Sequence, residues 1–497
     1  MAAPYEPVIG LEVHAQLLTR TKIFCGCANA YGAPPNTQIC PVCIGLPGSL
    51  PVPNRAAIEL AMRAALALGC QVRERSVFAR KNYFYPDLAK NYQISQYELP
   101  LNEHGKLDIE VDGETRAVRI DRIHLEEDAA KNLHGVGSGQ STLVDFNRAG
   151  TPLIEIVSAP DLRSSAEAEE YLRRLREVLM AVGANDGNLE QGSFRCDANV
   201  SIRPRGQDEL GTRTEIKNIN SFRFVRKAID YEISRQQAVL GGGGEVAQET
   251  RQWSDAQGKT LSMRSKEEAM DYRYFPDPDL PPIVVSAEQI EQARAELPEL
   301  PADKRTRWQQ ELGVTASDAA VLSGHPALAR LFEGTVERLA AALDGKLEVA
   351  KAGKRTANFI QAEVLRDTSL DGLDAKMPVE PAALAELLAL VEAGTISGKM
   401  AKGVFSEMVE SGKSPAAIVE DEGLSQVSDT GAIEEEVRKV LASSPDNVAA
   451  YRAGKKNVLG WFVGQVMKAT KGQANPKLVN ETLRKLLEDD SGGGDPS

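Results

Sequence analysis

The sequence lacks the long apolar runs of membrane proteins. No segment approaches the roughly 20 apolar residues that a membrane-spanning helix needs. The first residues, Met-Ala-Ala-Pro-Tyr-Glu, contain neither a basic region nor an apolar core, so they do not have the form of a signal peptide. With 42 % hydrophobic and 26 % charged residues, the composition is that of an ordinary globular protein. We therefore expect a cytoplasmic protein, whose thiols stay reduced.

Several nucleotide-binding and catalytic motifs are missing as well. The chain has no G-x-x-x-x-G-K-[ST] phosphate loop, because the stretch from Gly394 to Met400 has the wrong spacing and ends in methionine. The kinase motifs, the Rossmann glycine fingerprint and the G-x-S-x-G elbow are also absent. These enzyme classes are therefore excluded as the source of any nucleotide chemistry.

The chain as a whole has no excess of positive charge, but one segment near its C-terminus does. The 497 residues carry a formal net charge of −13, so contact with RNA would need a locally basic surface. Between Arg452 and Lys485 the chain has eight basic residues and a single acid, Glu481. A basic stretch is often only a solvated helix face, but this one has the opposite sign to the rest of the chain. It is the candidate RNA-binding segment.

Cysteine is scarce, with six residues, but four of them are clustered. Their pattern is C-x-C, twelve residues, then C-x-x-C. Four thiolates in two tight pairs suit one tetrahedral zinc ion, with an iron–sulfur site or idle thiols as alternatives. A closed four-sulfur site holds a loop together and performs no chemistry, so the zinc would be structural. The predicted ligands are Cys25, Cys27, Cys40 and Cys43.

One apolar strand contains a carboxylate that needs a partner. The stretch from Leu153 to Val157 is typical of a strand, and Glu155 lies in it between two isoleucines. If Ile154 and Ile156 face a core, Glu155 faces the other way, together with two apolar residues. That face is not an ordinary wet one, so the carboxylate requires a cation, a hydrogen-bond donor or a metal ion.

Two further segments supply candidate metal ligands. Glu12 and His14 are two residues apart on an N-terminal strand and so share one face. The strand from Val118 ends in an acidic run, in which alternation groups Glu127 with Ile123 and Leu125. An ordinary solvated surface explains both observations as well. The alternative is that these segments bring their acids and the imidazole to Glu155.

Polar residues that suit a nucleotide occur on two more predicted strands and two aromatic loops. Residues 194–203 alternate strictly between apolar and polar, and residues 214–218 repeat the pattern. A solvated sheet face would show this alternation too, and aromatic loop residues are often core. However, the mixture of basic, acidic and amide groups is also what a nucleotide with its metal requires. The candidate phosphate-binding residues are Lys81, Tyr83, Arg195, Asp197, Lys217 and Arg273.

The composition divides the chain into a β-rich part and a helical part. Beyond about residue 286, Ala, Leu, Glu and Lys recur with helical spacing. We predict an α+β protein: a mixed or antiparallel sheet domain over 1–294, a helical domain over 295–405 and a basic helical tail domain over 406–489. The last residues, 490–497, are rich in Gly and Asp and are predicted to be disordered.

Several long motifs, in one order along most of the chain, resemble the GatB family, the B subunits of the glutamyl/aspartyl-tRNA amidotransferases. They are Gly10-Leu-Glu-Val-His14, Lys81-Asn-Tyr-Phe-Tyr-Pro86, the residues from Asp145 to Glu155, Arg195-Cys-Asp-Ala-Asn199, Asp271-Tyr-Arg-Tyr-Phe-Pro276 and Gly472-Gln-Ala-Asn-Pro476. The resemblance implies that the sheet domain is a cradle similar to that of glutamine synthetase. It also implies an ATP-dependent ligase that amidates mischarged tRNA.

In that family, ATP and Mg²⁺ or Mn²⁺ serve to phosphorylate the side-chain carboxylate on Glu-tRNA(Gln), Asp-tRNA(Asn) or both. Ammonia then displaces the phosphate. Together with the strand geometry, the resemblance predicts that Glu12, His14, Glu127 and Glu155 form the catalytic metal site, and that ATP binds at the phosphate-binding residues named above. The alternatives are a non-catalytic tRNA-binding scaffold and a two-metal phosphodiesterase that uses the same acids.

The resemblance also implies partners. Because this chain has no recognisable amidase nucleophile, ammonia would come from the amidase subunit GatA, with GatC as the small third subunit of a heterotrimer. Mischarged tRNA is an expected partner, and the synthetase that mischarges it is a further candidate; no membrane contact is expected. The expected tRNA-binding residues of the tail are Lys455, Lys456, Lys468, Lys471 and Lys477.

Overall fold

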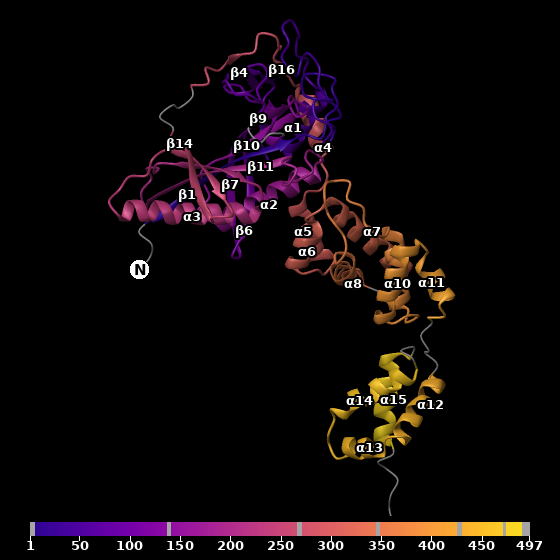
Figure 1. Cartoon of the computed structure of the whole chain (residues 1–497). Coiled ribbons are helices and arrows are strands. Elements are labelled where there is room, and N and C mark those ends of the chain that lie inside the picture. The colour runs from indigo at the N-terminus through magenta and orange to yellow at the C-terminus, as the bar shows by residue number, and fades with distance from the viewer. Residues whose placement is uncertain are drawn as a thin grey trace, which may run out of the picture. The chain divides into compact units, whose positions relative to one another are not determined.

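The computed structural model describes residues 5–136, 141–265, 271–343, 348–424, 430–470 and 474–489 (Figure 1). The chain divides into two compact units. The first extends through Lys304 and includes Ser323–Pro326 and Leu370–Ala375, and the second contains the rest. The division into three domains after residues 294 and 405 stays a prediction, and 490–497 lie outside the described residues. Among the described helices, none combines the length and apolar character of a membrane-spanning segment.

A nine-stranded sheet is the centre of the first unit. Only β12 and β13 are parallel neighbours among its described strands; all other neighbours are antiparallel. The predicted α+β fold with an N-terminal mixed sheet is therefore confirmed. In order across the sheet, the strands are β14 (Lys259–Ser265), β13 (Glu249–Ser254), β12 (Thr214–Ile219), β11 (Phe194–Pro204), β1 (Tyr5–Gln16), β10 (Pro152–Ser158), β7 (Glu114–Glu127), β6 (Asn102–Val111) and β2 (Gln71–Val72).

One face of this sheet is apolar and covered by helices. Ile9, Leu11 and Val13 on β1, and Ile154 and Ile156 on β10, are at most 1 % exposed. Helix α2 (Ser165–Ala181) packs against β6 and α3 (Phe222–Gly241) against β11, and Figure 1 shows both along one side of the sheet. Because strand residues alternate between faces, Glu12 and His14 on β1 and Glu155 on β10 point to the opposite side. That side holds the candidate site.

Side-chain caps set where the helices of the first unit begin. The Asn54 side chain accepts a hydrogen bond from the N–H of Ala56 and starts α1 (Arg55–Ala67). Ser164 caps α2 and Ser221 caps α3 in the same way. Each cap pairs a backbone N–H that the first helical turn leaves without a partner. Helix α4 (Ala287–Ala295) begins with a capping box at Ser286.

Short strands form three small sheets beside the main one. They are β15 (Phe275–Pro276) with β4 (Ala79–Asn82) and β5 (Tyr92–Ser95); β16 (Ile283–Val284) with β3 (Arg75–Ser76); and β8 (Lys131–Val136) with β9 (Ser141–Asp145). The first of these joins the two aromatic loops of the sequence. The Asn82 side chain fastens that junction, donating to the carbonyl oxygens of Tyr272 (3.3 Å) and Arg273 (2.8 Å).

The named secondary-structure elements of the second unit are all helices among its described residues. The first turn of α5 (Pro301–Glu311) belongs to the first unit, and the rest of that helix belongs to the second. The helices that follow are α6 (Ala316–Ser323), α7 (Pro326–Ala342), α8 (Val349–Phe359), the π-helical turn η1 (Ile360–Val364), α9 (Pro381–Glu392), α10 (Gly398–Ser411), α11 (Pro415–Asp421), α12 (Thr430–Ala442), α13 (Pro445–Arg452), α14 (Val458–Ala469) and α15 (Pro476–Asp489). The last four share a core that includes the fully buried Val437, Phe462 and Leu483.

Candidate metal and nucleotide site

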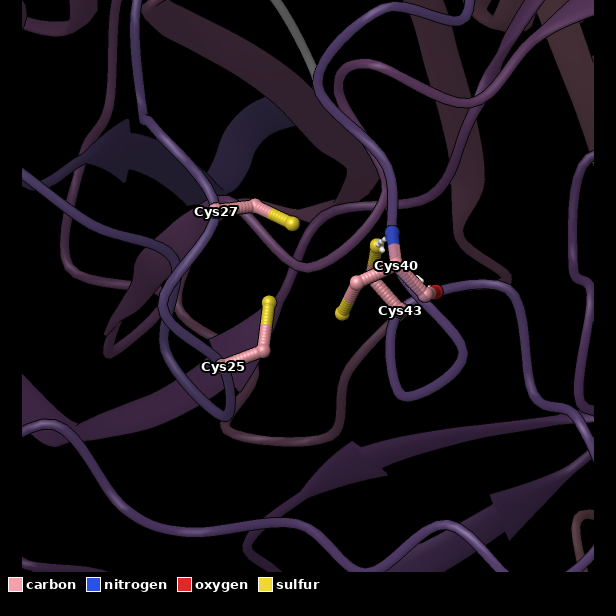
Figure 2. A group of neighbouring side chains, drawn as sticks. All are labelled: Cys25, Cys27, Cys40 and Cys43. Atoms are coloured by element: carbon pink, nitrogen blue, oxygen red, sulfur yellow. Dashed lines mark hydrogen bonds between the residues drawn. The ribbon is translucent and has the colours of Figure 1, made fainter.

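The four clustered cysteines come together in the loop between β1 and α1. Figure 2 shows Cys25 and Cys27 facing Cys40 and Cys43 with their sulfur atoms directed toward a common centre. One sulfur atom from each residue lies within 4.8 Å of the other three. The backbone N–H of Cys40 donates to Cys43 Sγ at 3.1 Å. Four converging thiols with no open position fit a structural zinc ion.

The electrostatics of the cysteine cluster favour a bound cation. A hydrogen bond from Cys25 lowers the pKa of Cys43 to about 4, so Cys43 is a thiolate at neutral pH. The same hydrogen bond, together with burial, raises the pKa of Cys25. Burial raises the pKa of Cys27 to about 11. Cys43 is thus a thiolate beside the protonated thiols of Cys25 and Cys27, and a divalent cation would convert these two thiols to thiolates.

A second cluster lies on the polar face of the sheet, where β1, β10 and β7 are neighbours. His14 lies opposite Glu155, and Glu155 lies opposite His124. His14 Nε2 is 3.4 Å from Glu155 Oε2 and 3.7 Å from Glu126 Oε1. His124 Nε2 is 3.6 Å from Glu155 Oε2 and 3.7 Å from Glu126 Oε2. Two imidazoles and two carboxylates therefore alternate in one closed group, the acid–histidine cluster.

His124, Glu126 and Glu155 are buried and His14 is half-buried, and their charges compensate one another. Burial opposes ionisation of Glu155, but the neighbouring His124 and His14 outweigh it and hold the pKa of that carboxyl well below its usual range. Burial likewise opposes ionisation of Glu126, yet the hydrogen bond from His124 lowers its pKa. Burial disfavours a charged His14, but Glu155 and Glu126 raise its pKa. Both acids are therefore anionic at neutral pH.

This cluster can hold a divalent cation. Ligand atoms of His14, Glu126 and Glu155 lie within 4.8 Å of one another. Two carboxylates and one imidazole suit Mg²⁺ and, through the imidazole, Mn²⁺. The predicted ligand Glu12 lies two residues before His14 on the same face but is not one of this group of three; its Oε1 accepts from Asn199 Nδ2 at 2.9 Å. Burial raises the pKa of Glu12, and Glu155 adds to the rise.

The structure brings Glu126, not Glu127, to His14 and Glu155, which corrects the predicted grouping. The Glu127 carboxylate pairs with Lys90 Nζ, and its Oε1 accepts from the N–H of Ile94 at 2.9 Å. Its side chain is thus occupied within the fold.

Strand alternation explains the correction. Ile123, Leu125 and Glu127 point to one face of β7, whereas His124 and Glu126 point to the other. The sequence places Glu127 with the buried residues, which is right, but the polar cluster lies on the opposite face. His124 is a member of the cluster that the sequence prediction did not include. The signal for it is its spacing of two residues from Glu126, which puts both on the polar face.

Of the candidate phosphate-binding residues, Lys81 and Arg195 lie within electrostatic range of this cluster. Lys81 Nζ lies 4.8 Å from the Tyr272 ring centroid and 6.0 Å from that of Tyr83. Burial disfavours the charge of Lys81, but Glu126 and Glu155 raise its pKa, so the lysine lies within their electrostatic range. Strand β4 therefore presents the ammonium group of Lys81 to both acids of the cluster.

Two further candidates, Arg195 and Lys217, are paired with acids on the sheet face, whereas Arg273 lies in a loop. Arg195 donates to Asp128 Oδ2 at 3.0 Å. Lys217 Nζ lies 3.0 Å from Asp197 Oδ2 and 3.3 Å from Glu215 Oε1, so Asp197 acts as the partner of a cation. Arg273 is exposed in the loop before β15, with a left-handed φ of 44°. These candidates therefore lie on separate elements and do not form one contact group with the cluster.

The candidate tRNA-binding residues of the tail are open to solvent. Lys455, Lys456, Lys468 and Lys477 are all exposed. Lys456 Nζ also lies 4.4 Å from the centroid of the Tyr451 ring. Lys471 lies outside the described residues. The exposed lysines are available to phosphates, and their role in binding stays a prediction.

Comparisons with known proteins match both parts of the chain. Residues 7–291 match the family model described as the GatB/GatE catalytic domain, and residues 343–487 match the one described as the GatB domain. The aspartyl/glutamyl-tRNA(Asn/Gln) amidotransferase B subunit of Syntrophotalea carbinolica is 55 % identical over 488 residues, covering 98 % of this chain and 99 % of that protein. The proteins of the same description from Geobacter sulfurreducens and Anaeromyxobacter dehalogenans strain 2CP-C are 55 % and 54 % identical, covering 97 % and 98 % of this chain and 99 % of each relative. Both clusters described above lie within the matched catalytic domain.

Replacing Cys43 with serine should reduce bound zinc from about one ion per chain to a small fraction of one, because three sulfur ligands leave the site open. Elemental analysis of protein purified without chelator measures this, with Cys70→Ala, a buried thiol outside the cluster, as the control. Because Cys25 and Cys27 are protonated without metal, zinc uptake should release protons, and zinc affinity should rise with pH. Wild-type protein without zinc would contradict the assignment.

Replacing Glu126 or its neighbour Glu127 should have different effects, because the two acids lie on opposite faces of β7. Glu126→Gln should weaken Mn²⁺ binding about tenfold or more, because it removes one of the carboxylate ligands. Glu127→Gln should leave Mn²⁺ binding nearly unchanged and lower thermal stability, because Lys90 loses its buried partner. Titration of Mn²⁺ followed by electron paramagnetic resonance, with thermal unfolding in parallel, tests both variants. Loss of Mn²⁺ binding in Glu127→Gln but not in Glu126→Gln would show that Glu127 is the metal ligand.

Proposed function

This chain belongs to the GatB family, the B subunits of the aspartyl/glutamyl-tRNA(Asn/Gln) amidotransferases, and on that premise we propose that its acid–histidine cluster is where the amino-acid carboxylate is activated. The protein is a subunit of a glutamine-hydrolysing amidotransferase that acts on tRNA. It amidates Glu-tRNA(Gln), Asp-tRNA(Asn) or both. One observation carries the proposal: the ligand atoms of His14, Glu126 and Glu155 converge within 4.8 Å inside the family's catalytic domain.

Activation and amidation are two linked substitutions. A carboxylate oxygen of the mischarged amino acid attacks the γ-phosphorus of ATP, and ADP leaves. Ammonia then attacks the acyl carbon, inorganic phosphate leaves, and the nitrogen loses a proton to give the amide. The carboxylate is already ionised at neutral pH, so its attack needs no general base. The main barrier is the approach of two anions, which requires positive charge around them.

The chain offers that positive charge on several elements. Lys81 is half-buried within electrostatic range of the cluster, and Arg195 and Lys217 are held on the same sheet face by Asp128 and Asp197. These cations would bind and orient the phosphates, with Arg273 at the edge of the aromatic loop. When bound by His14, Glu126 and Glu155, Mg²⁺ or Mn²⁺ supplies further positive charge to the phosphoryl group.

Zinc would have a purely structural role in the same domain. The loop that carries the four cysteines makes hydrogen bonds to the end of β9 and to the residues after it, including Asn36 N–H to Asp145 Oδ1 at 3.0 Å and Gln38 N–H to Asn147 Oδ1 at 2.8 Å. A metal that fixes this loop would therefore also fix the turn that leads into β10 and Glu155.

Ammonia must come from a different chain, because no amidase nucleophile is recognisable in this sequence. We assign that role to the amidase subunit GatA, with GatC completing a heterotrimer. The relatives are named as B subunits, which supports an assembly of several chains. The enzyme would work on charged tRNA in the cytoplasm, where the free thiols of the cysteine cluster stay reduced.

The Glu155→Gln variant should lower the rate of amide formation by about a hundredfold or more, because it removes a charge from the centre of the cluster. Its tRNA affinity should stay close to that of wild type. The assay uses the assembled complex with ATP, glutamine and mischarged tRNA, and Glu110→Gln, an exposed acid on β6, is the control. Normal turnover in Glu155→Gln would favour a non-catalytic scaffold, and metal-dependent RNA cleavage without ATP would favour a phosphodiesterase.

The basic tail would bind the body of the tRNA. Lys455→Ala combined with Lys477→Ala should weaken tRNA binding and reduce the slope of log affinity against log salt by about 1.4 to 1.8, because two phosphate contacts are lost. Lys351→Ala combined with Lys376→Ala, two exposed lysines outside the tail, is the matched control. Titration of the complexes with tRNA at two salt concentrations measures both. Equal affinities and slopes in the two double variants would show that these tail lysines do not contact the tRNA.

A further inference from the structure

Lys22 is a fully buried lysine that has no part in the site described so far. It lies between β1 and the first pair of cysteines and is 1 % exposed. Its ammonium group donates to the carbonyl oxygen of Phe146 at 3.3 Å. Across the described residues this group has no other hydrogen-bond acceptor, and no carboxylate lies within 4.0 Å of it. Such burial is costly, because the charge is removed from water without an anion beside it.

The side chains of Lys22 and Cys43 lie against the same glycine. Gly150, in the turn that leads into β10, has a left-handed φ of 82°. A β-carbon at this position would lie 3.5 Å from Lys22 Cδ and 3.6 Å from Cys43 Cβ. The lysine thus reaches the cysteine cluster from the side of the turn. The hydrogen bond from Cys25 is the main cause of the low pKa of Cys43, and the charge of Lys22 lowers that pKa further.

Hydrogen bonds of the backbone hold Lys22 in this position. Its N–H donates to the carbonyl oxygen of Cys27 at 3.0 Å, and its own carbonyl oxygen accepts from Asn54 Nδ2 at 3.2 Å. The N–H of Ile23, the next residue, donates to the carbonyl oxygen of Gly150 at 2.9 Å. The cysteine loop, the start of α1 and the turn before β10 therefore meet at Lys22, and the fold fixes where its side chain begins.

The cysteine cluster supplies an anion for this lysine when it holds zinc. Four thiolates outweigh the charge of one Zn²⁺ ion, so a closed four-sulfur site keeps a net negative charge. Cys43 is buried, whereas the other three cysteines are half-buried. Water therefore screens the charge on Cys43 Sγ least, and a cation beside this sulfur stabilises the site most.

We propose that Lys22 is the buried counter-cation of the zinc–thiolate centre and a positioning residue for the turn that leads to Glu155. Its ammonium group compensates the thiolate charge at Cys43 and holds the carbonyl group of Phe146 at the same time. Zinc occupancy is thereby coupled to the position of the turn. The inference rests on the zinc site of the proposed function but not on the amidation reaction, so the two can fail separately.

The test compares variants of Lys22 in the full chain. Lys22→Met removes the charge with little change in volume, and Lys22→Gln removes the charge but keeps a hydrogen-bond donor for Phe146. Both should raise the Kd for zinc about tenfold or more, as the loss of an outer-shell partner does, measured by competition with a chelator. Zinc should also raise the Tm of wild type by more than that of Lys22→Met, because the buried ammonium gains its full counter-charge when zinc binds.

Substitution of Co²⁺ for zinc separates the effect of charge from that of packing. A positive charge beside sulfur lowers the energy of the sulfur electrons and so raises the energy of the thiolate-to-cobalt charge-transfer band. This band, which only thiolate ligands give, should move to longer wavelength in both Lys22 variants. Asn54→Ala removes hydrogen bonds from the same loop without changing its charge, and Lys106→Met removes an exposed lysine on β6. Both controls should leave the band at its wild-type wavelength.

An unmoved band in the Lys22 variants would overturn the inference, even with weaker zinc binding, because the lysine would then act through packing alone. If Lys22→Met does not fold, Lys22→Gln decides the result in the same way. A wild-type chain without zinc would reject the zinc site and the role of Lys22 together. Amide formation by the wild-type complex is measured in parallel. Normal amidation with an unmoved band rejects the counter-cation alone, whereas a moved band without amidation rejects the proposed role of the acid–histidine cluster alone.

Discussion

Mutual neutralisation of buried charges is the constraint on which the site depends. Glu126 and Glu155 are 2 % and 8 % exposed, and two carboxylates this deep in a protein are costly unless cations accompany them. His14, His124 and Lys81 supply the compensation from three different elements. The fold therefore has to bring β1, β7, β10 and the 79–82 strand together before either acid can be ionised at neutral pH.

The register of the sheet brings the acids and the imidazoles together. Direct pairing of His14 with Glu155 and of Glu155 with His124 sets the three side chains in one row across neighbouring strands. A shift of one residue would turn each of them into the apolar core beside α2 and α3. The buried isoleucines on the other face oppose any such shift, so hydrophobic packing on one side of the sheet fixes the electrostatics on the other.

At the edges of the site, too, structural contacts position the functional residues. The cysteine loop is hydrogen-bonded to the turn that precedes β10, and Asn82 ties the second aromatic loop to β4. Neither contact takes part in chemistry, but both decide where Glu155 and Lys81 lie. Rigid strands at the centre and fastened loops at the rim are what an enzyme needs to bring two anions together.

The sequence by itself determined the faces of the strands, the cysteine cluster, the basic tail and the family. Period-two alternation, thiol spacing and local charge are properties of neighbours in the chain, and each survives without tertiary information. It selected Glu127 rather than Glu126, because adjacent acids point to opposite faces and only the structure shows that the imidazoles and Glu155 meet Glu126 on the face opposite Ile123 and Leu125. It also could not place Tyr97 against Tyr274, residues 177 positions apart whose stacking depends on how β4, β5 and β15 pair. Those choices belong to the tertiary structure, because cross-strand register and burial arise only when distant segments meet.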